Sequence, residues 1–584
     1  MAYTAKEIKE LVGDAKHAAG RTELRERWDT DYGLWRNEDY KGDLHEGEME
    51  YYTSCLISSM GNKCINSLSN SDKKIWIPIT DESEKERTVV AKTERFCHGG
   101  LRLAEKNLTS AVEPGILDSM AWHACNRGYV IPKLLLRVDK EGTVIFDFDI
   151  KDAYDTYWGI GSDRKMQWIC FERWGSYAQL KEEYGDKEEF GAVSVSSKSK
   201  KSISVLAFCT KDAEYTVIGD SIINTYQHKL GHIPAGVFLT TATPTVHSEK
   251  YDDTLKDKGE SVYANVRKVA VVISRVMSYY LEAVAMSVQT PLVALVKGGK
   301  LQVDKNPREL GDIWVLDADK VVDVRELIKP EMTQSAMALF QMMMREFSIG
   351  GISPVAYGYV DSAYPVGTTN ILTHEATTIM KPALHAMQDA LSWVCNEMIW
   401  QYKRLKDVGD LYIQGVDNKR DKFSVKIKAD DIQDETEVEV ELVPDVAMDE
   451  MQNAQIASQL VGSGIISKLL ARDRYAKIDD PEGEEERINY ETVSANPEYQ
   501  LRKALIKAKE DKDQEAMQVI SDMLAQLTEQ KMAARQAQMP SQGMNPQLRG
   551  QMRATTNMPN VPSGMGVGNV PENVRTAIRS RRGG

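Results

Sequence analysis

The sequence predicts an α+β fold that is mainly helical and divided into several domains. The chain has 584 residues, more than a single hydrophobic core usually organises. Apolar residues at helical spacing dominate residues 1–110 and the part of the chain after residue 259, whereas strand-like patterns fill residues 129–239. Hydrophobic residues make up 42% and charged residues 27% of the chain, which is the balance of an ordinary folded protein.

Helices with one strand between them are expected in the first 110 residues. Residues 5–32 are rich in charge and repeat apolar side chains at helical spacing, which predicts an amphipathic surface helix. Residues 49–68 and 83–108 are expected to form two further helices. Residues 74–79 are expected to form a short strand between these two helices.

Antiparallel strands are expected next. Residues 129–138 and 143–150 flank a turn that contains glycine, and they predict a β-hairpin. A strand over residues 166–174 and a short helix over residues 177–184 come before a meander of four strands. The expected meander strands are 203–209, 214–218, 221–227 and 235–239.

The clearest helix covers residues 259–289 and would be about 45 Å long. Its apolar residues recur at spacings of three and four, which places them on one stripe. Many of them are β-branched, so packing rather than intrinsic propensity must stabilise this helix. The stripe, which we predict to be a contact surface, includes Val262, Val266, Val269, Ile273, Val276 and Tyr280.

Short and long elements alternate after this helix. Residues 291–330 are interpreted as a compact insert, residues 332–347 as a second helix, and residues 352–368 as a loop rich in glycine and tyrosine. A helix over residues 370–405 is expected to kink at Pro382, which has no N–H to donate. The strands of the insert are expected at residues 292–296, 313–316 and 321–324.

The C-terminal part is expected to be mainly helical after two strands. The strands are residues 423–427 and 436–442. Helices over residues 449–460 and 497–538 are separated by a break at Gly462-Ser463-Gly464. The tail from residue 539 is rich in Met, Asn, Gln, Gly and Pro, a composition typical of disorder.

The charge of the chain is uneven. The net charge is −14, but the residues from 536 onward contain six arginines, no lysine and one acid, so they carry +5 and residues 1–535 carry −19. Phosphate binding depends on Lys and Arg, so an acidic body is poorly suited to gripping nucleic acid. It suits a surface that must not hold DNA tightly.

Catalytic motifs are absent from the sequence, which has no GxxxxGK[ST] phosphate loop, no GxSxG and no HExxH. We therefore expect neither an enzyme nor a bound cofactor. Asp147, Asp149, Asp152 and Asp155 could form an acidic metal site. However, the first two alternate with apolar residues, which favours a half-buried strand whose acids face water.

The cysteines and histidines also do not predict a metal site. Cys97, His98, His123 and Cys125 are ligand-type residues, but they lack the i, i+3 or i, i+4 spacing of chelating pairs, so buried structural roles are favoured. The seven cysteines are scattered and odd in number, which predicts reduced thiols. No apolar run is long enough for a membrane helix and no signal peptide is recognised, so synthesis in the cytoplasm is expected.

An ordered set of local sequences resembles the portal (head–tail connector) family of tailed bacteriophages, and the resemblance covers most of the chain. The similar segments are 150–155 and 174–185 in the wing domain, 231–234 before the stem, 368–376 at the start of a kinked wing helix, and 464–487 in the crown. The family's domain order implies a wing (1–254 and 367–447), a stem (255–289 and 331–349), a clip (290–330), a tunnel loop (350–366), a crown (448–538) and a flexible basic tail (539–584).

This resemblance implies a ring of about twelve subunits at a capsid vertex. The ring would be the channel for genome packaging and ejection in the virion, after synthesis in the host cytoplasm. Its implied partners are double-stranded DNA, the terminase motor, the major capsid protein and a head–tail adaptor. The tunnel loop would approach DNA through Tyr357, Tyr359, Asp361 and Tyr364.

Two other functions remain open at this point. The chain could be another virion structural protein, such as a minor capsid, scaffold or ejection protein, and a ring with a central hole would argue against that. It could also be a metal-dependent nuclease that uses the aspartates between residues 147 and 155. Magnesium-dependent nicking that is lost in Asp149→Ala would support the nuclease.

Overall fold

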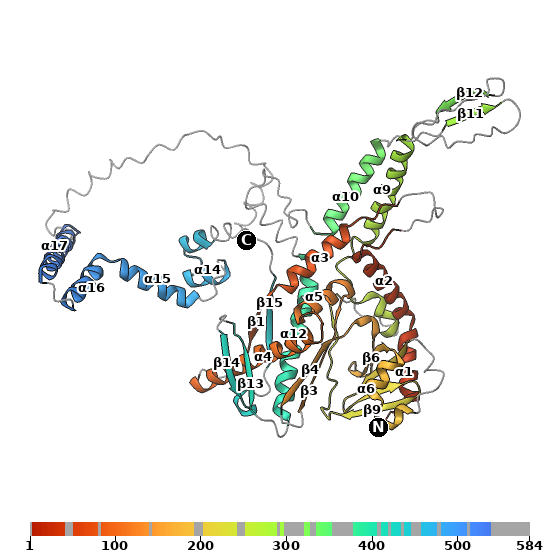
Figure 1. Cartoon of the computed structure of the whole chain (residues 1–584), viewed down its shortest axis with the longest axis horizontal. Coiled ribbons are helices and arrows are strands. Elements are labelled where there is room, and N and C mark those ends of the chain that lie inside the picture. The colour runs from red at the N-terminus through yellow and green to blue at the C-terminus, as the bar shows by residue number, and fades with distance from the viewer. Residues whose placement is uncertain are drawn as a thin grey trace, which may run out of the picture. The chain divides into compact units, whose positions relative to one another are not determined.

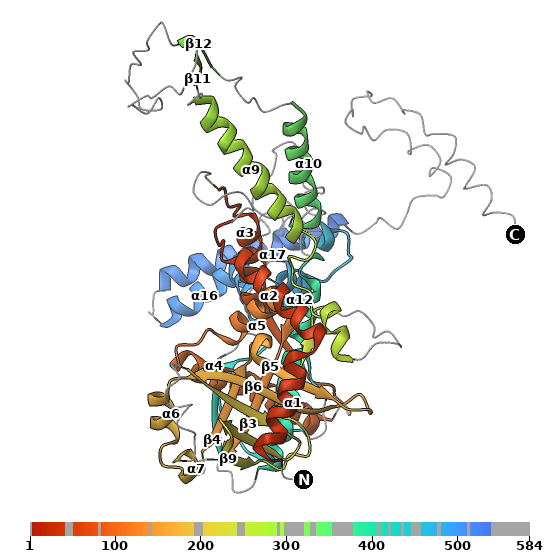
Figure 2. The ribbon, with the colours of Figure 1, turned by 90° about the vertical axis from the view of Figure 1, so that its right-hand side faces the viewer.

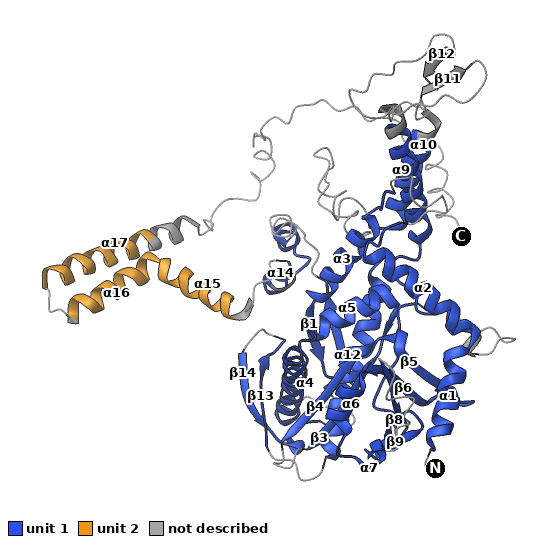
Figure 3. Cartoon of the chain, turned by 45° about the vertical axis from the view of Figure 1, so that its right-hand side comes forward, with its two compact units in different colours: residues 1–481 blue, residues 482–584 orange. Residues whose placement is uncertain are grey.

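The computed structural model describes residues 3–40, 51–79, 83–138, 143–191, 202–241, 251–288, 292–296, 321–326, 334–352, 378–405, 410–418, 422–433, 437–444, 457–475, 481–510 and 514–538. Within these residues the chain is α+β and mainly helical, with small antiparallel sheets, as predicted (Figure 1). It divides into two compact units, residues 1–481 and residues 482–584 (Figure 3). Every strand of the described residues lies in unit 1.

Two helices, rather than one, begin the chain. α1 (Ala5–His17) starts with a capping box in which Thr4 and Glu7 each accept a hydrogen bond from the other's backbone N–H. The backbone is extended at Ala18, with a ψ of 136°, and α2 (Ala19–Trp35) follows. The prediction of one surface helix over residues 5–32 is wrong in this respect, and α2 also buries Trp28 in a core.

The main core of unit 1 lies among several helices and several strand pairs, which include a β-hairpin. The helices include α3 (Leu56–Ser69), α4 (Glu84–Ser110), α5 (Ile116–Arg127) and α12 (Lys381–Arg404). The hairpin pairs β3 (Pro132–Val138) with β4 (Val144–Ile150), which confirms the predicted hairpin. α5 was not predicted.

A second sheet has five antiparallel strands in the order β5-β6-β7-β8-β9. They are β5 (Thr156–Ile160), β6 (Met166–Gly175), β7 (Ile203–Cys209), β8 (Ala213–Ile218) and β9 (Ser221–Gln227). The predicted strands of this region are confirmed, except that residues 235–239 do not join the meander. Instead, β10 (Phe238–Leu239) pairs with β2 (Tyr129–Val130). β5 was not predicted, and the predicted helix α6 (Tyr177–Tyr184) is confirmed.

Side chains close both edges of a small sheet formed by β1 (Asp72–Trp76) and β15 (Glu439–Val443). Asn396 and Ser392 of α12 each accept a backbone N–H from the β15 side at 2.9 Å, and Gln388, one turn further, donates to a β15 carbonyl at 3.5 Å. On the other edge, Asn418 accepts from the N–H of Ile75 and donates to its carbonyl. These contacts occupy edge groups that could otherwise pair with another strand.

α12 begins at Lys381, so Pro382 lies in its first turn, where a missing N–H leaves no hydrogen bond unmade. Residues 379 and 380 are in a turn, and residues 353–377 lie outside the described residues. Residue 378 is helical, so the described residues show a helical segment interrupted by a two-residue turn just before Pro382, and the rest of the predicted helix, residues 370–377, lies outside the described residues. Beyond α12, β13 (Leu411–Val416) pairs with β14 (Lys422–Ile427), and β13 was not predicted.

α9 (Arg267–Val288) and α10 (Gln334–Gly350) pack against each other and project from the rest of unit 1 (Figures 1 and 2). We name this helix pair the stalk. α9 is shorter than predicted, because residues 262–266 form turns before it. In the insert between the two helices, the predicted strands β11 (Leu292–Val296) and β12 (Val321–Glu326) are confirmed and pair antiparallel, whereas residues 313–316 lie outside the described residues.

Helices also form the C-terminal part. In unit 1, residues 457–462 are helical and Gly464 has a φ of +71°, which places a break where it was predicted, before α14 (Lys468–Arg474). Unit 2 contains α15 (Pro481–Ala495), α16 (Pro497–Glu510) and α17 (Gln514–Gln538). α16 and α17 pack against each other (Figure 3), so the prediction of one helix over residues 497–538 is wrong.

Candidate functional site

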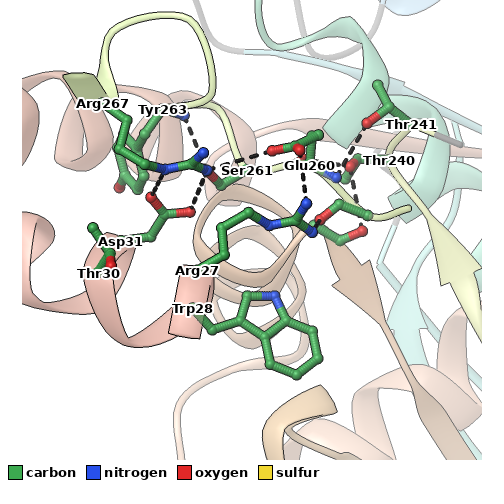
Figure 4. Close-up of polar contacts among 12 residues, drawn as sticks. Arg27, Trp28, Thr30, Asp31, Thr240, Thr241, Glu260, Ser261, Tyr263 and Arg267 are labelled. Atoms are coloured by element: carbon green, nitrogen blue, oxygen red, sulfur yellow. Dashed lines mark hydrogen bonds and ion pairs between the residues drawn. The ribbon is translucent and has the colours of Figure 1, made fainter. Parts of the chain in front are cut away.

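A buried ion pair fixes the first turn of α9 to α2 (Figure 4). Asp31 of α2 is fully buried and accepts hydrogen bonds from Nε and Nη2 of Arg267, at 2.5 and 2.8 Å. The Ser261 hydroxyl donates to the same carboxylate at 2.7 Å. Burial alone would lower the pKa of Arg267, but the hydrogen bonds and charge of Asp31 outweigh it and raise that pKa. The Asp31–Arg267 ion pair therefore holds the first turn of α9, where the stalk begins, against α2.

Arg27 of α2 fixes the segment that precedes α9 (Figure 4). Its guanidinium pairs with Glu260 at 2.7 Å and donates to the carbonyls of Lys256, Lys258 and Gly259 at 2.6 to 3.1 Å. The hydroxyl of Thr240 donates to the carbonyl of Glu260 at 2.7 Å. One arginine thus replaces the regular hydrogen bonds that this irregular segment lacks.

Close packing constrains the same junction from the side of α3 and α5. Tyr263 is buried, and its hydroxyl donates to Asn126 of α5 at 2.9 Å. Burial raises the pKa of this tyrosine, which keeps the hydroxyl protonated as a donor. A Cβ atom at Gly61 of α3 would lie 2.0 Å from the hydroxyl oxygen of Tyr263, so a larger residue would force a shift.

One face of α9 is covered by the backbone of residues 51–54. The hydroxyl oxygens of Ser278 and Ser274, which are four residues apart on α9, accept hydrogen bonds from the N–H groups of Tyr52 and Ser54 at 2.8 and 3.2 Å. Both serines are buried. The face of α9 that carries Ser274 and Ser278 is therefore covered by residues 51–54 of the same chain.

The predicted stripe of α9 divides into two parts. Val262, Val266 and Ile273 are buried in the main core of their own chain, and Val269 and Val276 are partly buried against it. These residues contact their own subunit, which differs from the expectation that they contact a neighbour. Tyr280, further along, is 36% exposed.

Large apolar side chains are exposed on both helices of the stalk. Ile349 of α10 is 74% exposed, Met342 of α10 is 54% exposed, and Tyr279 of α9 is 49% exposed. The set is Val272, Tyr279, Tyr280, Leu281 and Val284 on α9, and Met337, Leu339, Met342 and Ile349 on α10. Exposed large apolar residues on two packed helices are candidates for an interaction site, and we name this set the stalk surface.

A pocket of about 760 Å³ lies at the base of the stalk, among the start of α9, the end of α10 and the start of α12. Its polar lining includes Thr241, Glu260 and Asn265, and its apolar lining includes Ile349 and Pro382. The exposed side chain of Ile349 thus borders a hollow next to the Arg27 and Arg267 network.

A polar bridge joins the predicted step before the stem, residues 231–234, to α12. His232 Nε2 lies 2.7 and 2.9 Å from the two carboxylate oxygens of Glu397, and Gln401 donates to Glu397 at 2.6 Å. Gln401 also bonds the carbonyl of Leu134 and the N–H of Leu136 in β3. The hydrogen bond that His232 donates to Glu397 raises the pKa of His232.

The predicted DNA-contacting residues Tyr357, Tyr359, Asp361 and Tyr364 lie outside the described residues. The basic tail from residue 539 also lies outside them, as does most of the insert between β11 and β12.

Three of the four aspartates between residues 147 and 155, namely Asp147, Asp149 and Asp152, have separate partners. Asp147 pairs with Arg137 at 2.9 Å, and Asp149 pairs with Lys151. Asp152 receives two hydrogen bonds from Arg127, each at 3.1 Å; burial would raise the pKa of Asp152, but neighbouring positive groups lower it. In the parts of the chain that the structure describes, no group of three or more His, Cys, Asp or Glu side chains is arranged to hold a metal ion.

The cysteine and histidine candidates do not come together as one site. Cys97 interacts with Cys395, and His98 lies 3.0 Å from the amide oxygen of Asn418. Burial lowers the pKa of His98 to about 4 and also lowers that of His123, so both are neutral near pH 7. Cys125 is fully buried.

Sequence reasoning missed the residues that hold the stalk. Asp31 and Arg27 lie in a run of charges that resembles a solvated helix face. Trp28 between them was the available signal, because its burial orients this face of α2 toward the core.

Comparisons with known proteins include a weak similarity to a solved structure. No protein-family model and no curated protein matches the sequence. A chain of the solved structure "Neck of empty GTA particle computed with C6 symmetry" is similar over 76% of this chain and 92% of its own length, with 11% identity and a TM-score of 0.38. Among the described helices, none is both long and apolar enough to span a bilayer.

Proposed function

We propose that the chain is a portal protein, a non-enzymatic subunit of a ring at a capsid vertex through which a phage genome passes. The observation that carries the proposal is the stalk surface, whose large apolar side chains lie on both α9 and α10. The base of each stalk is fixed by the Asp31–Arg267 pair, so its direction is defined by the subunit. Copies that pair head to tail through such surfaces close into a ring when the rotation allows.

The distribution of charge supports the passage of DNA. Residues 1–535 carry −19, and a wall of that sign repels phosphates and permits sliding. In this proposal the stalk surrounds the channel and the insert between α9 and α10 docks the terminase motor and later the head–tail adaptor. The major capsid protein surrounds the ring. The tunnel loop with Tyr357, Tyr359, Asp361 and Tyr364 faces the duplex.

A charge placed in the stalk surface should prevent ring formation. Met342→Lys replaces an exposed apolar side chain, whose burial in an interface is worth about 1.5–3 kcal/mol, with a charge that resists burial. Sedimentation velocity should show the wild-type chain as a large closed oligomer and Met342→Lys as smaller species. The circular dichroism melting curve of the subunit should change little, because Met342 is outside the core.

The matched control is Gln341→Lys, which adds the same charge at the next residue of α10, where the side chain is polar and exposed. This variant should assemble like the wild type. Equal assembly of both variants would show that the stalk surface is not the subunit contact and would contradict the proposal.

A further inference from the structure

Unit 2 lacks a core of its own in the part that the structure describes. Among its described side chains, residues 483–509 and 514–530, only Ala508 is buried. α16 turns Leu501, Leu505 and Ala508, its least exposed apolar residues, to one side, and α16 packs against α17. Two helices with one buried residue bury too little apolar surface to offset the entropy of ordering. The described part of unit 2 therefore requires another partner.

α15 is the least supported of these helices. It leads away from the α16–α17 pair (Figure 3), and its Tyr490 is 62% exposed. A helix of 15 residues is marginal in water without tertiary contacts. Asn496 is the one residue between α15 and α16, whereas two antiparallel helices need a loop of about two to five residues. α15 therefore cannot fold back on the α16 of its own chain.

The exposed faces of α15 and α16 match in spacing. On α15, every residue from Glu486 to Val493 is exposed, and Glu486, Tyr490 and Val493 lie on one side of the helix at spacings of four and three. On α16, Tyr499, Lys503 and Ile506 are exposed at the same spacings, on the side opposite Leu501 and Leu505. An antiparallel arrangement of the two stripes sets Glu486 opposite Lys503 and Tyr490 opposite Tyr499.

The charges of the two helices are also complementary. α15 contains five glutamates and one arginine, and α16 contains four basic residues and two glutamates. α17 has three acids and two basic residues, so it offers α15 no comparable attraction. Complementary charge of this kind selects partner and register.

We infer that α15 of one subunit docks on the exposed stripe of α16 of the next subunit, with Glu486 beside Lys503 and Tyr490 beside Tyr499. The contact is heterologous, because each copy gives one acidic helix and one basic helix, and it therefore continues from copy to copy. It rests on the proposed ring, which supplies the neighbour. It extends that proposal by assigning unit 2 a second subunit contact with a defined partner surface.

Disulfide trapping in the full-length chain tests this contact. Two chains are co-expressed in a Cys55→Ser background, one with Tyr490→Cys and the other with Tyr499→Cys, so that a bond between these positions must join two subunits. Mild oxidation should give a covalent dimer on a denaturing gel. Little or no dimer from an assembled ring would overturn the inference, as would equal trapping of Tyr490→Cys with Val519→Cys on α17.

Charge reversal tests the register. Glu486→Lys and Lys503→Glu should each lower the trapping yield by about fivefold, which is the upper range for one exposed ion pair, and the two together should restore it. Glu529→Lys, on α17, makes the same reversal outside both stripes and should change nothing. Absence of rescue in the double variant would overturn the pairing of Glu486 with Lys503.

Sedimentation velocity of the same samples separates the two proposals. A ring that forms without a disulfide between α15 and α16 would contradict only this inference. A wild-type chain that remains monomeric would contradict the proposed function.

Discussion

Removing the Asp31 carboxylate should release the start of α9. The Asp31→Ala variant leaves Arg267 without the two hydrogen bonds that it makes at 2.5 and 2.8 Å. Loss of one partner from a buried ion pair costs about 3–5 kcal/mol. The Arg267 side chain is 19% exposed and also lies 3.4 Å from Glu260, so the lower value, about 3 kcal/mol, is expected here.

Hydrogen exchange followed by mass spectrometry measures this effect locally, which suits a chain of several domains that does not unfold in one step. Amides of the first turns of α9 should exchange about 100-fold faster in Asp31→Ala, because each 1.4 kcal/mol is about a factor of ten. Asp29→Ala is the matched control, since Asp29 is on the same helix but exposed. Its exchange should match the wild type.

The double variant Asp31→Leu/Arg267→Met separates charge pairing from packing. It leaves no unpaired charge, so it should cost less than Asp31→Ala alone. An increase in exchange of less than threefold in Asp31→Ala, or a double variant that is as damaged as the single one, would refute the idea that this ion pair fixes the stalk.

Two further predictions concern titration and thiol reactivity. The pKa of His232 is raised above 6.5 by Glu397, so its bridge should stabilise the fold fully below that pH and lose this contribution as the pH rises through the raised value. The difference in hydrogen-exchange protection of α12 between wild type and His232→Gln should therefore shrink with rising pH once intrinsic exchange rates are corrected for, and a constant difference would argue against the bridge. A thiol reagent should modify Cys55 quickly in the native protein, whereas the six buried cysteines should react only on unfolding; burial raises the pKa of Cys64 and Cys209 to about 12. Native mass spectrometry that finds several fast thiols would contradict the described burial.

The periodicity of apolar residues in the sequence correctly predicted several helices and strands. The β3–β4 hairpin, the strands β7 to β9 and helix α6 follow from alternation, turns and spacing within each segment. The break at Ala18 carries no such signal, because alanine is a strong helix former and only its extended ψ of 136° ends α1. β5 was missed since it is short and gains its place by pairing with β6.

Tertiary contacts determine which apolar residues of the stalk are buried, and the sequence pattern alone could not show this. In the predicted helix 259–289, Val266 and Tyr280 occupy equivalent positions on one stripe, yet Val266 is fully buried by its own chain and Tyr280 is partly exposed. The difference arises because α3 and the segment 51–54 cover the part of α9 up to Ser278. Likewise Asp31 looks like a surface charge until α9 places Arg267 beside it. Such pairings join residues more than 200 positions apart, beyond the reach of local patterns.

Negative-stain electron microscopy of the purified full-length chain is the most direct test of the central claim. The proposed head-to-tail contact through the stalk surface predicts uniform rings with a central hole. A particle population with the mass of one subunit, 65.6 kDa, and no ring at micromolar concentration would contradict it.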